Sequence, residues 1–174
     1  MRPVVLQAWK DAVLEAVSLH LPEFSYIEKH DPGDEKHLMK FAWTAMPGLL
    51  CGIAFRPLDE SFDAFVGWST NGKYPYSAAR RAKSGSDLWD FNQSVLMVPW
   101  IVAAGKSGAA AWQLWCPTPD EASNPEAFGA AFAKYITSPL TSQEASELVS
   151  APVDAAVKEL KDSGGRYLEK RING

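Results

Sequence analysis

Cysteine and histidine are scarce in this chain, and their scarcity limits the chemistry available to it. The 174 residues include two cysteines, Cys51 and Cys116, and three histidines. Secreted disulfide scaffolds are much denser in cysteine, and two thiols permit one bridge without requiring it. Both cysteines follow apolar neighbours, so we expect them to be small buried hydrophobic residues. A hidden catalytic triad would have to recruit one of only three imidazoles.

A surplus of positive charge is also absent. Lysine and arginine total 17 against 21 acidic residues, which gives a formal net charge of −4. Nucleic-acid binders usually carry a basic face, and the one tight basic group, Arg80, Arg81 and Lys83, is expected to be a solvated loop. We therefore expect no nucleic-acid partner. The acidic balance fits a basic protein partner better than a phosphate-rich one.

Long apolar runs are missing as well. The longest, Val95 to Ala104, contains a proline and falls short of the roughly 18 residues that a membrane helix needs. Lys10 and Asp11 interrupt the first apolar stretch, so no signal-peptide core forms. These features predict a cytoplasmic protein with no membrane partner. The length suits one domain over residues 1–174, and no linker or repeat divides it.

Hydrophobic periodicity predicts an α+β fold that starts with a helix over about 3–21, opened by Pro3 and ended by Pro22. Four strands with short connections follow, and short connections demand antiparallel pairing. Their expected bounds are 25–30, 38–45, 49–56 and 62–69. Two more apolar segments, 95–102 and 109–115, resemble strands joined by a hairpin turn at 105–108, with a buried helix as the alternative for the first. The sheet should thus hold about four to six strands.

The last third of the chain is predicted to be helical. One helix opens at Asn124-Pro125 and stops at Pro139. Thr141 with Glu144 three residues later is the capping-box pattern, so a short helix should start there and run to about Val149. Pro152 should open another helix, and the Gly164-Gly165 pair should break it.

No motif for nucleotide binding or for a nucleophilic serine is present. Gly105-Lys106-Ser107 matches the last three residues of a phosphate-binding loop. That motif also needs a glycine at position 100, where this chain has Trp100. No serine lies in a Gly-x-Ser-x-Gly elbow. The sequence accordingly predicts no cofactor.

Two histidines flank an acidic turn. His30 and His37 enclose Asp31, Asp34 and Glu35, and divalent metals favour such ligand sets. Lys36 would repel a cation, and a solvated charged turn is the preferred interpretation. A metal site at His30 and His37 stays open as the alternative.

Acidic groups are the remaining candidates for a site. Asp59, Glu60 and Asp63 surround one strand start, while Asp87 and Asp90 flank Trp89 in the polar stretch 73–90. Long loops in compact domains are often functional. Two carboxylates across a cleft can hydrolyse glycosides, although surface charge is the simpler interpretation and acidic interface residues come next.

The order of the predicted helices and strands resembles that of a known group of proteins. The leading helix, the meander with Phe65-Val66-Gly67-Trp68-Ser69 and Tyr74-Pro75, and the closing segment 157–168 resemble small cytoplasmic bacterial proteins of uncharacterised families, some of them immunity proteins against antibacterial toxins. The resemblance implies an α+β fold and tight one-to-one binding to a toxin domain. It carries over no contact residues, because such interfaces differ from pair to pair.

The leading hypothesis is a non-enzymatic cytoplasmic binding protein, an immunity protein that covers the active site of a cognate toxin. Acidic rims speed association with basic partners, and a tryptophan can anchor the contact. The expected partner-binding residues are Asp59, Glu60, Asp63, Asp87, Trp89 and Asp90. The alternative is a small hydrolase with a carboxylate- or metal-based site in a deep pocket. A structural subunit with a large exposed apolar patch is the third possibility.

Overall fold

The computed structural model describes residues 1–30, 34, 36–70, 72, 74–75, 95–99 and 111–172. These residues form an antiparallel sheet in the order β1-β2-β3-β4-β5, with β6 also paired to β4. The strands are β1 Ser25–Ile27, β2 Met39–Met46, β3 Leu49–Pro57, β4 Ser61–Ser69, β5 Val95–Pro99 and β6 Ala111–Gln113. The predicted α+β class is confirmed, as are the antiparallel meander and the strand, not helix, at 95–99.

The predicted hairpin between the last two strands is wrong. β5 pairs with Phe65–Ser69 of β4, and β6 pairs with Ser61–Asp63 of the same strand. Both run antiparallel to β4, so they run in the same direction along one edge of it. Together they occupy the edge that one longer strand would otherwise fill. The predicted turn at 105–108 lies outside the described residues.

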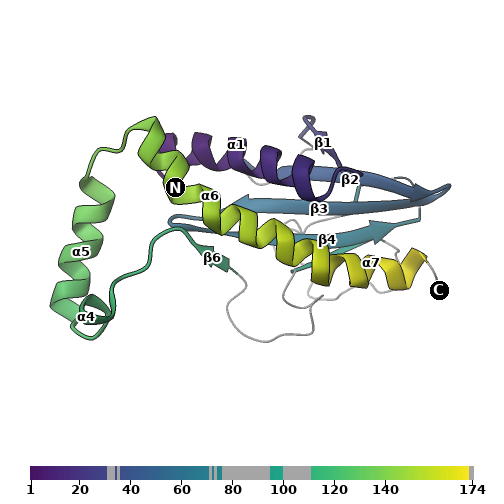
Figure 1. Cartoon of the computed structure of the whole chain (residues 1–174). Helices are drawn as coiled ribbons and strands as arrows, with labels where there is room; N and C mark the ends of the chain where they lie inside the picture. The colour runs from purple at the N-terminus through teal and green to yellow at the C-terminus, as the bar shows by residue number, and fades with distance from the viewer. Residues whose placement is uncertain are drawn as a thin grey trace.

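Two long helices cover one face of the sheet (Figure 1). α1 (Pro3–His20) begins with a proline at its first turn, where the missing amide hydrogen costs no helical bond. α6 (Ser142–Glu159) lies beside it and begins at the predicted capping box of Thr141 and Glu144. A single core forms where both helices meet the sheet, and its largest fully buried side chains include Trp9, Phe41, Phe55, Phe62, Val149 and Val153.

The predicted break of the last helix at its proline and at its glycine pair does not occur. α6 continues through Pro152, passes into a π-helical turn, η1 (Leu160–Gly164), and goes on as α7 (Gly165–Ile172). Val149, Val153 and Val157 are each 0% exposed. Burying each side chain contributes about 1.5–3 kcal/mol, and together these terms outweigh the roughly 3 kcal/mol that an interior proline costs.

The opposite face of the sheet carries ion pairs. Lys40 is buried, and its Nζ lies 2.7 Å from Asp34 Oδ2. Tyr74 packs beside it and donates a hydrogen bond to the carbonyl oxygen of Ile53 at 2.5 Å. Burial raises the pKa of Tyr74 well above its usual value. This face therefore combines paired charges with a small buried apolar cluster of Leu38, Ala54 and Phe65, on which Tyr74 packs.

The two cysteines differ in their surroundings. Cys51 is 0% exposed on β3, as predicted, and burial raises the pKa of its thiol to about 11. Cys116 is exposed and free, so its predicted burial is wrong. The reason is local: the chain leaves the sheet after Leu114 and turns outward. Among the described residues, no helix combines the length and apolar character that crossing a bilayer requires.

Candidate functional site

Two helices between β6 and α6 stand beside the body of the fold and do not pack on its sheet (Figure 1). These are α4 (Pro119–Ala122) and α5 (Pro125–Thr137), and we call residues 115–138 the arm. Thr118 and Glu121 form a capping box at the start of α4, which was not predicted from the sequence. Asn124 caps α5 by accepting hydrogen bonds from two amides of its first turn.

α5 is apolar, yet none of its residues is buried. Its hydrophilic side chains are Glu126, Lys134 and Thr137, and the rest of the helix is mainly alanine and aromatic or aliphatic residues. Phe128 and Ile136 are 41% and 43% exposed. An isolated helix of this length is marginal in water, so most helices of globular proteins are stabilised by burying one face. α5 therefore presents apolar side chains to solvent without burying any of its residues.

An aromatic cluster holds the inner side of α5. The Trp115 ring lies 5.4 Å from those of Phe132 and Tyr135 and 5.7 Å from that of Phe128, measured between centroids. Phe128 and Phe132 stack with their planes 8° apart. Such pairs contribute about 0.5–1.5 kcal/mol each beyond their buried area. Trp115 therefore fixes the helix against the segment that leads into it.

A second anchor comes from the start of α1. Arg2 Nη1 donates to the carbonyl oxygens of Tyr135 (2.9 Å) and Ser138 (3.0 Å), at the end of α5. The guanidinium carbon lies 4.4 Å from the centre of the Tyr135 ring. A cation at the carbonyl end of a helix also meets the negative end of its dipole. Arg2 thereby ties the arm to the body.

The turn between β3 and β4 reaches the same end of the molecule. Leu114 donates its amide hydrogen to the carbonyl oxygen of Glu60 at 3.1 Å, just before the arm begins. Burial raises the pKa of Tyr135 to about 12, and the nearby Glu60 carboxylate acts in the same direction. Asp59 in this turn is fully exposed. The structure thus brings one of the predicted contact residues, Glu60, next to the arm, while the Asp59 carboxylate lies 3.9 Å from the N-terminal ammonium of Met1.

The other predicted contact residues divide into two groups. Asp63 is 7% exposed, and both its carboxylate oxygens accept hydrogen bonds from Arg56. Its carboxylate is committed to that ion pair and offers little to a partner. Asp87, Trp89 and Asp90 lie outside the described residues.

The histidines do not gather into a ligand set. His37 has a left-handed backbone (φ 65°), and its Nδ1 lies 3.4 Å from Lys10 Nζ. Desolvation, Lys10 and Lys36 lower the pKa of His37. His20 Nε2 lies 2.7 Å from Asp154 Oδ1, a contact between α1 and α6. Within the described ranges, no three His, Cys, Asp or Glu side chains lie close enough together to hold a metal ion.

The exposure of the arm was not foreseen from the sequence. The helix at 125–137 was predicted, but whether its apolar side chains are buried or exposed was not predicted. The sequence of this helix is apolar on almost all sides, with few polar positions. Such a pattern indicates either a helix that is completely buried or one that a partner covers. Comparison with protein families, with curated proteins and with solved structures gives no match for this chain.

Proposed function

We propose that this chain is a non-enzymatic binding protein that docks another protein through the arm, and that it neutralises a toxin domain by one-to-one binding. The observation that carries the proposal is the exposure of Phe128 and Ile136 on a helix with no buried residue. Exposed apolar patches rimmed by polar residues mark protein interfaces. A helix of this kind inserts into an apolar groove of its partner.

The charge around the arm indicates the kind of partner. Asp120, Glu121 and Glu126 lie at the starts of α4 and α5, and the Glu60 carboxylate lies near Tyr135 of α5. Lys134 is the one basic residue of the two helices. An apolar centre with an acidic rim fits a basic partner, because opposite charges speed association. Many enzymes that cleave nucleic acids carry a basic substrate-binding face, and a toxin of that class would fit.

The test places a photo-crosslinking phenylalanine derivative at position 128 of the full chain in its native cell. A matched chain carries the same group at Leu19, an exposed apolar position of α1 that is 69% exposed. We expect one protein to be captured from position 128 and not from position 19. Equal capture from both positions would remove the arm from the interface.

Two further measurements separate the parts of the proposal. Sedimentation of the purified chain should show a monomer, since a crosslink between two copies would assign the arm to self-association. The captured protein, expressed alone, should arrest growth, and coexpression of this chain should restore it. If the captured protein does not arrest growth, this chain is a binding protein but its partner is not a toxin.

A further inference from the structure

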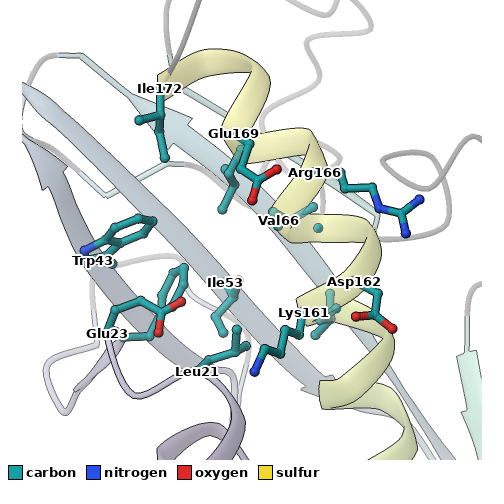
Figure 2. Close-up of a pocket in the computed structure, with 15 residues that line it drawn as sticks. Leu21, Glu23, Trp43, Ile53, Val66, Lys161, Asp162, Arg166, Glu169 and Ile172 are labelled. Atoms are coloured by element: carbon teal, nitrogen blue, oxygen red, sulfur yellow. The ribbon is translucent and has the colours of Figure 1, made fainter.

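A groove lies at the other end of the helical face, between the sheet and the last helical segment (Figure 2). Its volume is about 430 Å³. Its floor comes from Ile53 of β3 and Val66 of β4, and α7 with the π-helical turn forms one wall. The end of α1 and the chain just after it form the other wall. Ligand pockets for small molecules are typically about 300–1,000 Å³, so this groove is large enough for one.

The interior of the groove is apolar. Its lining includes Leu21, Ile53, Val66, Leu160 and Leu168, all no more than 5% exposed. These side chains belong to the main core and form the closed, deep end of the groove, while the partly buried Trp43 and Ile172 line its opening. The apolar body of a ligand would pack against Trp43 and Ile172.

Trp43 stands at the edge of the groove and is half-buried. Its ring lies 5.8 Å from that of Phe24, at 58°. The face of a tryptophan ring attracts organic cations electrostatically. The edge of the groove therefore favours a positive group over a neutral one.

Charged side chains complete the opening. Glu23 comes from the chain after α1, and Glu169 comes from α7 on the opposite side, while Lys161 points toward Leu21 (Figure 2). Asp162 and Arg166 also line the groove, with their side chains toward the outer side of the helix (Figure 2). Three carboxylates against two cationic side chains leave the opening negative.

The helix is built to lie close to the sheet here. Gly164 is buried, and a Cβ at this position would lie 3.7 Å from Val66 Cγ2. Neither Gly164 nor Gly165 places a side chain over the floor. π-helical turns occur frequently at functional sites, and η1 supplies one wall of this groove.

We propose that this groove binds a small organic cation, an alkylammonium with an apolar body. The body would lie against Trp43 and Ile172, and the ammonium would lie between Glu23 and Glu169 beside the Trp43 ring. This site is separate from the arm, and its occupation does not depend on the proposed protein partner.

The experiment compares three ligands that share one apolar chain: octylammonium, 1-octanol and octanoate, titrated into the full chain by calorimetry. We expect one octylammonium per chain, and affinity in the order ammonium, alcohol, carboxylate. Glu23 and Glu169 are exposed, so water and salt screen their attraction for the cation, and ammonium should bind about three- to tenfold more tightly than octanol. No binding below about 1 mM, or octanoate binding as tightly as octylammonium, would overturn the proposal.

A matched pair of variants locates the site. Glu23→Gln with Glu169→Gln should abolish the preference for ammonium over octanol and leave octanol binding unchanged. Glu15→Gln, at an exposed position of α1 that does not line the groove, should retain the preference. Equal effects from both would mean that the cation binds by diffuse surface charge and not here.

A final ligand distinguishes the source of the cation. Nα-acetyl-lysine methylamide carries the same ammonium on a shorter stem, as a protein side chain would. We expect it to bind at least about tenfold more weakly than octylammonium, because it buries fewer methylene groups. Comparable binding would assign the groove to a basic side chain of a protein and would refute a small-molecule site.

Discussion

Arg2 and Tyr135 connect the first residues of the chain to the end of α5, with Arg2 Nη1 2.9 Å from the Tyr135 carbonyl oxygen and the guanidinium over the Tyr135 ring. The two residues are 133 positions apart in the sequence. Since α5 buries none of its own residues, this contact and the Trp115 cluster are what position it. The arm should therefore open locally at a lower free energy than the sheet and the two long helices.

Arg2→Ala should loosen the arm and leave the core intact. The substitution removes two hydrogen bonds from a charged donor, worth about 1.5–3 kcal/mol each when fully buried and less here because Arg2 is partly exposed. We expect amide exchange in α5 to become about tenfold faster or more, measured by hydrogen exchange. Exchange in α1 and α6 should change little.

Arg166→Ala is the matched control for that experiment, because Arg166 is exposed on α7, with its side chain toward the outer side of the helix. It should leave exchange in α5 unchanged. Uniformly faster exchange across the chain of the Arg2 variant would show that Arg2 stabilises the whole domain and is not an anchor of the arm.

Tyr135→Phe should alter stability in alkaline solution. Burial raises the pKa of Tyr135 from its usual 10.0 to about 12. As the pH rises above about 10, the unfolded chain loses this proton first and the folded chain keeps it, so stability falls until about pH 12. The phenylalanine variant lacks this proton, so its free energy of unfolding should fall less over that window. Below about pH 10 the residue contributes no pH dependence.

Urea unfolding at about pH 8 and about pH 11 measures this difference. Cys51, with a pKa raised to about 11, also destabilises the folded chain as the pH rises, but it is present in both proteins and cancels in the comparison. Parallel declines in the two proteins would mean that Tyr135 ionises at the same pH in the folded and unfolded chains.

The parts of the fold that follow from local chemistry were predicted from the sequence, and those set by distant contacts were not. Thr141 and Glu144 are three residues apart, so their capping box was readable directly. Pro152 and Gly164-Gly165 also carry local signals, but buried contacts to α1 and the sheet override them. The exposure of α5 depends on where the chain leaves the sheet after β6, which no local pattern records. Asp59 and Glu60 were predicted at a turn, and only the fold shows that Glu60 lies beside the arm.

Ile136→Ser should separate binding from stability. Ile136 is 43% exposed near the end of α5, so its replacement should change the free energy of unfolding by less than about 0.5 kcal/mol. Affinity for the partner captured from position 128 should fall at least about tenfold, because an apolar anchor at the centre of an interface is lost. Leu19→Ser, at an exposed position of α1, should change neither quantity. Partner affinity that survives Ile136→Ser would exclude this face of α5 from the contact.

Gly52→Ala and Gly129→Ala should change stability in opposite directions. A Cβ on Gly52 of β3 would lie 2.9 Å from Pro75 Cγ and 3.0 Å from Tyr74 Cε2. Tyr74 cannot retreat without losing its hydrogen bond to Ile53, so we expect a loss of about 1–3 kcal/mol. Gly129 lies within α5 with nothing within 4 Å of an added Cβ, so alanine there should stabilise by about 0.5–1 kcal/mol.

Chemical unfolding of the two variants beside the unmodified chain measures both changes, provided that the slope against denaturant stays constant. The comparison is informative because both substitutions add the same methyl group and differ only in what surrounds it. A stabilised Gly52→Ala variant would show that Tyr74 and Pro75 do not pack over β3, and the buried pairing of Lys40 beside Tyr74 would then need a different cover. A Gly129→Ala variant with no gain would indicate that α5 is already unfolded much of the time, since a helix that is not formed gains nothing from a better helix former.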